Sequence, residues 1–293
     1  MENTLKETGA YRIQDPSFDI LKMDSYQLLI KFGASSSTVA VFEKESNKFL
    51  FAESFLYDNA ESDTSMVVRL QNIWNNHEYL IASFWKEVVL IPVNTHFTIV
   101  PSKVFSEEQS SDYLKLNTRI SQSKEHVFSQ ELSSIESTAV FAIGSELYDW
   151  FKEIYPQAEI KCSHLASSFL MGISSAIPSS SNTIYVNTSG KLMSVAVVQD
   201  GKLKFVNNFE YHRSPEDFNY FVLLVISELG LSQETVDVKV WGDISETTLQ
   251  MDVLKTYVKS LSFGDRPAEF TFTVPFNDIP NHFNLDIYSA TRR

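Results

Sequence analysis

Two short turns carry the residue types that could hold a phosphate group. The candidate residues are Lys31, Gly33, Ser35 and Ser36 in the first turn, and Asn187, Thr188, Ser189 and Gly190 in the second. Glycine lets a backbone approach a ligand closely, and the N–H groups of such a turn can point together at an anion. Lys31 could contact a phosphate as a point charge, whereas the neutral amide of Asn187 is a weaker partner for Mg²⁺ than a carboxylate. Gly, Ser and Asn are also the usual residues of tight turns that bind nothing, so that interpretation stands beside the functional one.

Other candidate chemistry is weaker. Cys162 and His164 lie two residues apart, which places both side chains on one side of an extended strand and makes a thiolate–imidazole pair conceivable. No third orienting group accompanies them, so a buried structural cysteine is the preferred interpretation. The six histidines lack the ligand spacing of a zinc site. We therefore predict neither a catalytic residue nor a metal site.

The elements that position the two turns follow one pattern that occurs twice, at 27–57 and at 183–211. In each copy an apolar strand, a small-residue turn, a second apolar strand and a third strand follow one another. Aligning Val39 with Val195 sets Lys31 opposite Asn187. Periodicity and capping residues then predict helices at 62–80, 106–116, 145–155, 164–176, 215–230, 245–261 and 277–290, strands at 88–92, 96–100, 125–132, 138–143, 159–162, 236–241 and 269–274, and an extended arm or edge element at 1–24.

The order from residue 183 onward is thus βββαβαβα, in which three antiparallel strands are followed by helical crossovers. This is the order of a ribonuclease-H-like unit. Two such units in tandem, in an α/β chain with mixed sheets, resemble the actin-like ATPase superfamily, and the chain is similar to a bacterial family of unknown function described as having an actin-like ATPase fold. We expect a first domain at 1–178, with inserted elements around 84–135, and a second at 179–293, divided at the polar break after Pro178.

The resemblance implies a nucleotide site that this sequence has altered. In the superfamily an acid in the first hairpin of each unit helps to hold Mg²⁺, but Lys31 and Asn187 stand at these positions. The nucleoside motif is a strand followed by paired glycines, and here Trp241 precedes a single glycine, Gly242, and Asp243. The resemblance therefore implies a vestigial nucleotide site that adds Gly242 and Asp243 to the two turns, with no cofactor. The lost acids argue equally against a two-metal nuclease of the ribonuclease H type.

Composition narrows the classes of partner. A net charge of −13 opposes binding to nucleic acid, and the longest apolar run, 221–226, is far shorter than the ~20 residues that span a bilayer. A single cysteine is compatible with a reducing compartment, so a cytoplasmic location with a protein partner is expected.

The sequence therefore leaves two hypotheses for function. The first is a non-catalytic actin-like protein that acts as an interaction or scaffolding module. The alternative is a divergent nucleotide-binding ATPase or kinase that uses the interdomain cleft, with acids such as Asp243 or Glu246 and with ATP and Mg²⁺ bound. The alternative predicts an open groove between 33–38 and 187–190, whereas Trp241 and Phe32 could fill the nucleoside space under the first hypothesis.

Overall fold

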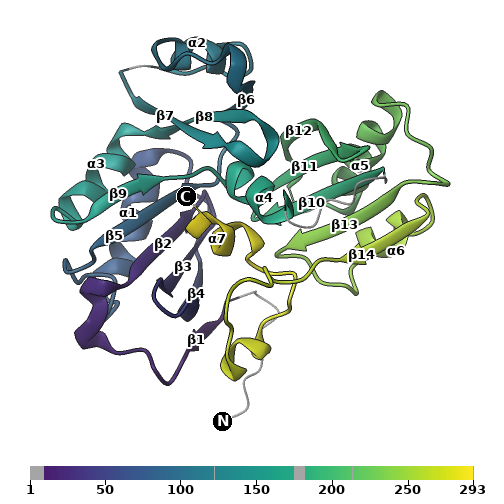
Figure 1. Cartoon of the computed structure of the whole chain (residues 1–293). Helices are drawn as coiled ribbons and strands as arrows, with labels where there is room; N and C mark the ends of the chain where they lie inside the picture. The colour runs from purple at the N-terminus through teal and green to yellow at the C-terminus, as the bar shows by residue number, and fades with distance from the viewer. Residues whose placement is uncertain (1–9, 122, 175–181, 213, 293) are drawn as a thin grey trace.

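The computed structural model describes residues 10–121, 123–174, 182–212 and 214–292, which form two α/β units side by side (Figure 1). The sheet of the first unit has the order β1-β4-β3-β2-β5-β9, and that of the second has the order β12-β11-β10-β13-β14. The strands of the first sheet are β1 (Arg12–Gln14), β2 (Gln27–Phe32), β3 (Ser36–Glu43), β4 (Lys48–Leu56), β5 (Glu87–Pro92) and β9 (Glu159–Cys162). The strands of the second sheet are β10 (Thr183–Ser189), β11 (Leu192–Gln199), β12 (Lys202–Glu210), β13 (Asp237–Gly242) and β14 (Ser260–Phe263).

The two sheets share one pairing scheme. β2 and β10 each pair antiparallel with the next strand and parallel with the strand that returns through a helix, β5 and β13 respectively. The central strands β2 and β10 are buried along their whole length, because helices or the other unit cover both faces. The predicted duplication is confirmed, and Lys31 and Asn187 occupy equivalent positions in their strands.

Side-chain hydrogen bonds cap the first turns of two helices. In α1 (Asp63–Trp74), Ser62 and Ser65 form a reciprocal capping box, and in α5 (Pro215–Glu228) the Ser214 side chain accepts a hydrogen bond from Asp217 N. The remaining α-helices are α2 (Ser110–Lys115), α3 (Ser145–Ile154), α4 (Leu165–Ser174), α6 (Leu249–Leu254) and α7 (Leu285–Ser289), and short 3₁₀ helices lie at Ile20–Ser25, Ser102–Val104, Glu107–Gln109, Ser133–Ile135, Val274–Asp278 and Ala290–Arg292. No helix among the described residues is long and apolar enough to cross a membrane.

An inserted subdomain lies between β5 and α3. It is a three-stranded antiparallel sheet with the order β6-β8-β7, built from β6 (Phe97–Pro101), β7 (Glu125–Leu132) and β8 (Ser137–Gly144), and it carries α2. The insertion overlaps the region around 84–135 where the sequence predicted extra elements, and it extends past that region to the end of β8 at Gly144.

The predicted helix at 245–261 and the predicted strand at 269–274 are both wrong in part. Only 249–254 is α-helical, because Ser245 and Thr248 hydrogen-bond locally before it, and the segment from Ser260 instead forms β14 on the edge of β13. In the second region a single isolated bridge joins Thr271 to Lys48. Its alternating aromatic residues reflect packing on the first sheet, where the ring of Phe272 stacks on that of Phe49.

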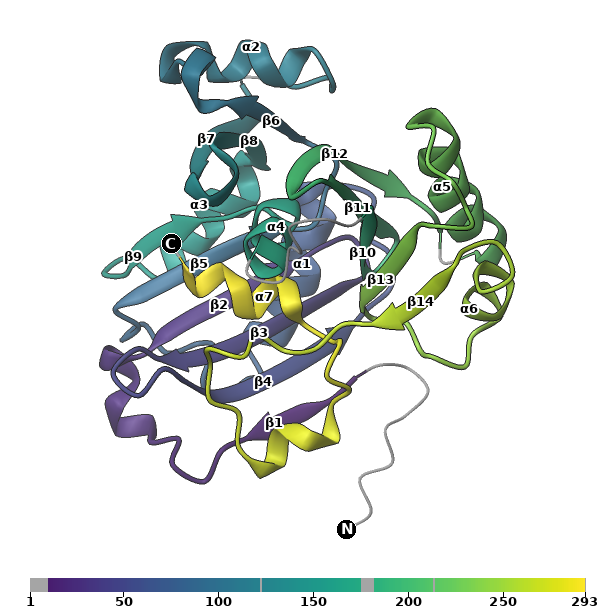
Figure 2. The ribbon, with the colours of Figure 1, turned by 45° about the vertical axis from the view of Figure 1, so that its right-hand side comes forward.

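The last helix of each unit crosses to the other unit. α4 contacts β11 of the second sheet, whereas α7 contacts β2 and β3 of the first, and the two helices pack against each other (Figure 2). Ile287 and Tyr288 of α7 are buried in a cluster with Leu29 and Phe49 of the first sheet. Helix α4 is almost wholly buried, which explains its nearly unbroken apolar sequence.

Segments near both ends of the described chain pack on the first unit. β1 pairs with β4 at the edge of the first sheet, so the predicted edge element is confirmed for 12–14, while residues 1–9 lie outside the described residues. The predicted domain division near residue 178 also lies outside them and stays a prediction. The segment after β14 returns to the first unit, so that unit's core contains residues from both ends of the sequence.

Candidate functional site

The two predicted turns face each other across the contact between the units. Gly190 adopts a left-handed conformation with φ of 59°, and a Cβ added to it would lie 3.4 Å from Ser35 Oγ. A cavity of about 350 Å³ opens beside this contact. It is lined by Gly33, Ala34, Ser35, Ser36, Asn59, Met66, Val93, Asn94, Thr95, Ser189, Gly190, Lys191, Leu192, Glu210 and His212.

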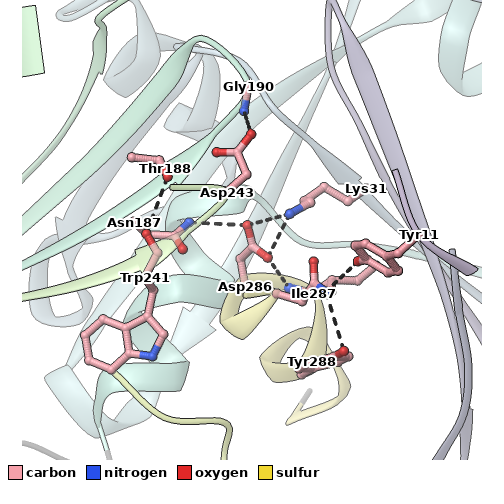
Figure 3. Close-up of polar contacts among 11 residues, drawn as sticks. Tyr11, Lys31, Asn187, Thr188, Gly190, Trp241, Asp243, Asp286, Ile287 and Tyr288 are labelled. Atoms are coloured by element: carbon pink, nitrogen blue, oxygen red, sulfur yellow. Dashed lines mark hydrogen bonds and ion pairs between the residues drawn. The ribbon is translucent and has the colours of Figure 1, made fainter. Parts of the chain in front are cut away.

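Lys31 and Asn187 lie behind this cavity in a buried polar cluster with Asp286 of α7 (Figure 3). Lys31 Nζ lies 3.0 and 2.9 Å from the two carboxylate oxygens of Asp286, and Asn187 Nδ2 donates to Asp286 Oδ2 at 3.2 Å. The Asp286 side chain is 1% exposed and that of Lys31 is 10% exposed. The two equivalent positions of the duplicated hairpins are therefore joined through one internal carboxylate.

Local structure around α7 fixes the Asp286 carboxylate. Ile287 N donates to Asp286 Oδ1 at 2.7 Å, and Asn284 before the helix has a left-handed φ of 65°. Asn284 Nδ2 donates hydrogen bonds to the hydroxyl oxygens of Tyr11 and Tyr288. Burial raises the pKa of Tyr288 to about 12 and that of Tyr11 well above its ordinary value, so both phenols are neutral at pH 7. Lys31 and Asp286 consequently balance each other's charge.

Asp243 hydrogen-bonds to the backbone of the second turn. Its Oδ2 accepts a hydrogen bond from Gly190 N at 3.0 Å, and its own N–H donates to Thr188 O at 3.2 Å. The N–H group that could serve an anion in the cavity thus already serves an internal carboxylate. This contact needs Gly242, whose φ is 104° and whose added Cβ would lie 2.0 Å from Thr188 O.

Trp241 fills the space beside the end of β13. The residue is 2% exposed, its ring lies 6.1 Å from that of Tyr185, and its Nε1 donates to Asp265 O at 3.0 Å. An added Cβ on Gly264 would lie 1.7 Å from the ring, so the backbone passes directly against it. Phe32, in contrast, packs on Phe151 within the first core.

The structure thus divides the predicted site residues into three groups. Those that line the cavity are Gly33, Ser35, Ser36, Ser189 and Gly190, those in the buried cluster are Lys31 and Asn187, and those that support the second turn are Thr188, Gly242 and Asp243. Sequence reasoning missed Asp286, which is 255 positions from Lys31 and carries no local signal of its role. Its place follows only from the return of α7 to the first unit.

The residues present do not fit a Mg²⁺ site of the superfamily's type. Lys31 is a cation at one acid position, Asn187 is neutral at the other, and the Asp286 carboxylate is engaged by both. Among the described residues, no group of three His, Cys, Asp or Glu side chains is placed to hold a metal. Glu210 is the one acidic residue that lines the described part of the cavity.

The Cys162 and His164 pair is part of the core. His164 Nδ1 accepts from Ala166 N at 3.1 Å, Nε2 faces Asn94 O at 3.2 Å, and the ring stacks on Phe97. Burial lowers the pKa of His164 to about 3, so the imidazole is neutral at pH 7. Cys162 is itself buried, which fits a structural cysteine.

Comparison with solved structures assigns the class of this fold. A Bacteroides thetaiotaomicron protein with an actin-like ATPase fold and unknown function matches with a TM-score of 0.75 and 20% identity, over 94% of this chain and 99% of that one. PilM, in the PilM–PilN type IV pilus biogenesis complex, matches with a TM-score of 0.62 and 12% identity, over 91% of this chain and 98% of that one. The chain therefore has the actin-like ATPase fold that the sequence predicted.

The sequence comparison then gives the family. The model of DUF3822, a family of proteins of unknown function, matches residues 15–261, and the chain belongs to that family. No curated protein matches the sequence.

Proposed function

We propose that this protein is a non-catalytic actin-like module that binds or organises other proteins. The observation that carries the proposal is the buried cluster of Lys31, Asn187 and Asp286, which links the two hairpins at the positions where acids would hold Mg²⁺. Such a cluster joins the two units through side chains of the chain itself, without any bound nucleotide, and removing one member of its buried ion pair would leave the other charge uncompensated.

Two further observations support the proposal. Asp243 takes the Gly190 N–H group from any incoming anion, and Trp241 occupies the space beside the end of β13. PilM, a structural neighbour, is known from a complex with another protein, PilN, which makes a protein partner a reasonable expectation for this chain. The net charge of −13 disfavours nucleic acid. We place this role in the cytoplasm, since a chain with one cysteine needs no oxidising compartment.

Calorimetric titration with Mg·ATP, together with a phosphate-release assay, tests the proposal. We expect no saturable heat and no release above buffer. A Ser36→Trp variant, which plugs the cavity, is the matched control, because it separates turnover at this site from a contaminating ATPase. Saturable binding with turnover in the original chain, lost in Ser36→Trp, would overturn the proposal.

The cavity favours a second candidate function, the binding of a small anion without hydrolysis. The turn at Gly33 to Ser36 and the side chain of Lys191 border about 350 Å³ that an anion could enter. Asp243 competes for the Gly190 N–H group, so an Asp243→Ala variant should bind inorganic phosphate more tightly than the original chain. A thermal-shift titration with phosphate tests this, and a flat response from both proteins would exclude it.

A further inference from the structure

A larger hollow lies away from the hairpins, between the inserted subdomain and the second unit. Its volume is about 900 Å³, and residues of β6 form one wall while residues of β12 form the other. Both views of the ribbon place β12 beside β6 (Figures 1 and 2). The hollow is a groove between two strands that belong to different sheets.

Both of these strands lie at the edges of their sheets in the part of the chain that the structure describes. β6 pairs with β8, and β12 pairs with β11, so neither strand has a second partner strand among the described residues, and consecutive residues of both strands, 97–99 and 202–207, line the groove. An edge strand presents alternate backbone N–H and C=O groups, which is the pattern that an extended polypeptide recognises when it adds as a further strand.

The side chains of the groove suit such a segment. Ile99 and Ile135 of the inserted subdomain and Leu203 and Val206 of β12 are half-buried and pack against the first core, so they form an apolar floor. A shift in register opposite Val197 and Val198 allows Leu203 and Val206 to face that core together. Alternate apolar side chains of an incoming strand can pack on this floor.

The charged side chains of β12 favour an acidic segment in the groove. Lys202 and Lys204 are both exposed and line the β12 side of the groove, on a chain whose net charge is −13. In a symmetric pairing of two β12 edges, the lysines of one copy would approach those of the other, which disfavours a second copy of this chain as the occupant. An acidic segment gains from both lysines.

We propose that this groove binds an extended segment of a partner protein that alternates apolar and acidic residues and adds as a strand to the edge of β12. The inference rests on the proposed role as an interaction module and names its binding surface. β6 and the turn at Glu136 form the opposite wall and limit the segment to a single strand.

The test uses two fluorescent peptides of about eight residues, one that alternates valine with glutamate and one that alternates valine with lysine. Fluorescence polarisation should show saturable binding of the acidic peptide and at least tenfold weaker binding of the basic one. In a Lys202→Glu/Lys204→Glu variant this preference should reverse. Lys22→Glu/Lys86→Glu is the matched control, because it makes the same charge change at exposed sites on the first unit and should leave the preference intact.

Hydrogen–deuterium exchange then locates the bound peptide. We expect protection of the backbone amides of β12, and an exchange pattern that is otherwise unchanged verifies that each variant is folded. The proposal is overturned by protection elsewhere, by equal binding of both peptides, or by no saturable binding of either up to about 1 mM. Each of these results leaves the Mg·ATP titration unaffected, so failure of the groove and failure of the non-catalytic assignment are distinguishable.

Discussion

Replacing Asp286 by asparagine should destabilise the protein by about 3 kcal/mol, the lower end of the range for a buried ion pair that loses one partner. Asparagine keeps an oxygen in the place of Oδ1 that can accept from Lys31 Nζ and from Ile287 N, but it removes the negative charge that balances Lys31 and the oxygen that accepts from Asn187 Nδ2. The lysine then remains charged in a site where its side chain is only 10% exposed. Urea unfolding followed by tryptophan fluorescence measures the loss.

A double-mutant cycle tests the cause of that loss. Lys31→Met alone should also destabilise, because it leaves the Asp286 carboxylate buried without its cation, whereas the double variant Lys31→Met/Asp286→Asn should lose much less than the sum of the single changes. Asp252→Asn is the matched control, since Asp252 pairs with Lys255 at 3.7 Å on the surface and should change stability by less than about 1 kcal/mol. A loss below about 1 kcal/mol for Asp286→Asn, or strict additivity in the cycle, would refute the reasoning.

Two other predictions concern backbone approach and pH. Gly242→Ala should lower the free energy of unfolding by at least about 2–3 kcal/mol, because φ of 104° and the nearby Thr188 carbonyl leave no room for a Cβ. Gly230→Ala, with nothing within 4 Å of its added Cβ, should lower it by about 1 kcal/mol. Thermal unfolding compares the two variants, and equal losses would contradict the argument. Burial lowers the pKa of His164 from 6.5 to about 3, so stability should fall as pH drops below about 6.5, by about 2 kcal/mol at about pH 5. His164→Gln should flatten that part of the pH profile, leaving a smaller slope from His282, whose pKa is also lowered by burial, and an unchanged profile would show that His164 is not responsible.

Local sequence patterns determined most of the architecture. The tandem three-strand units, the helix that starts at Pro215 and the inserted elements were all predictable, because alternation, helical spacing and caps act within a few residues of one another. The same patterns failed after residue 245. There, short-range apolar spacing could not distinguish a long helix from a short helix followed by the edge strand β14, since the pairing with β13 is a tertiary contact.

The candidate site shows the same division. The sequence alone determined that Lys31 and Asn187 are equivalent positions, because an internal duplication aligns them, and the resemblance to the superfamily implied that acids belong there. Only the tertiary structure decided what those residues do, since their partner Asp286 reaches them through the crossing of α7 to the first sheet. The position of the β6 and β12 edges on opposite sides of one groove is likewise a product of how the units pack. Ion pairs and grooves between distant segments depend on the folded backbone, and no local pattern in the chain encodes them.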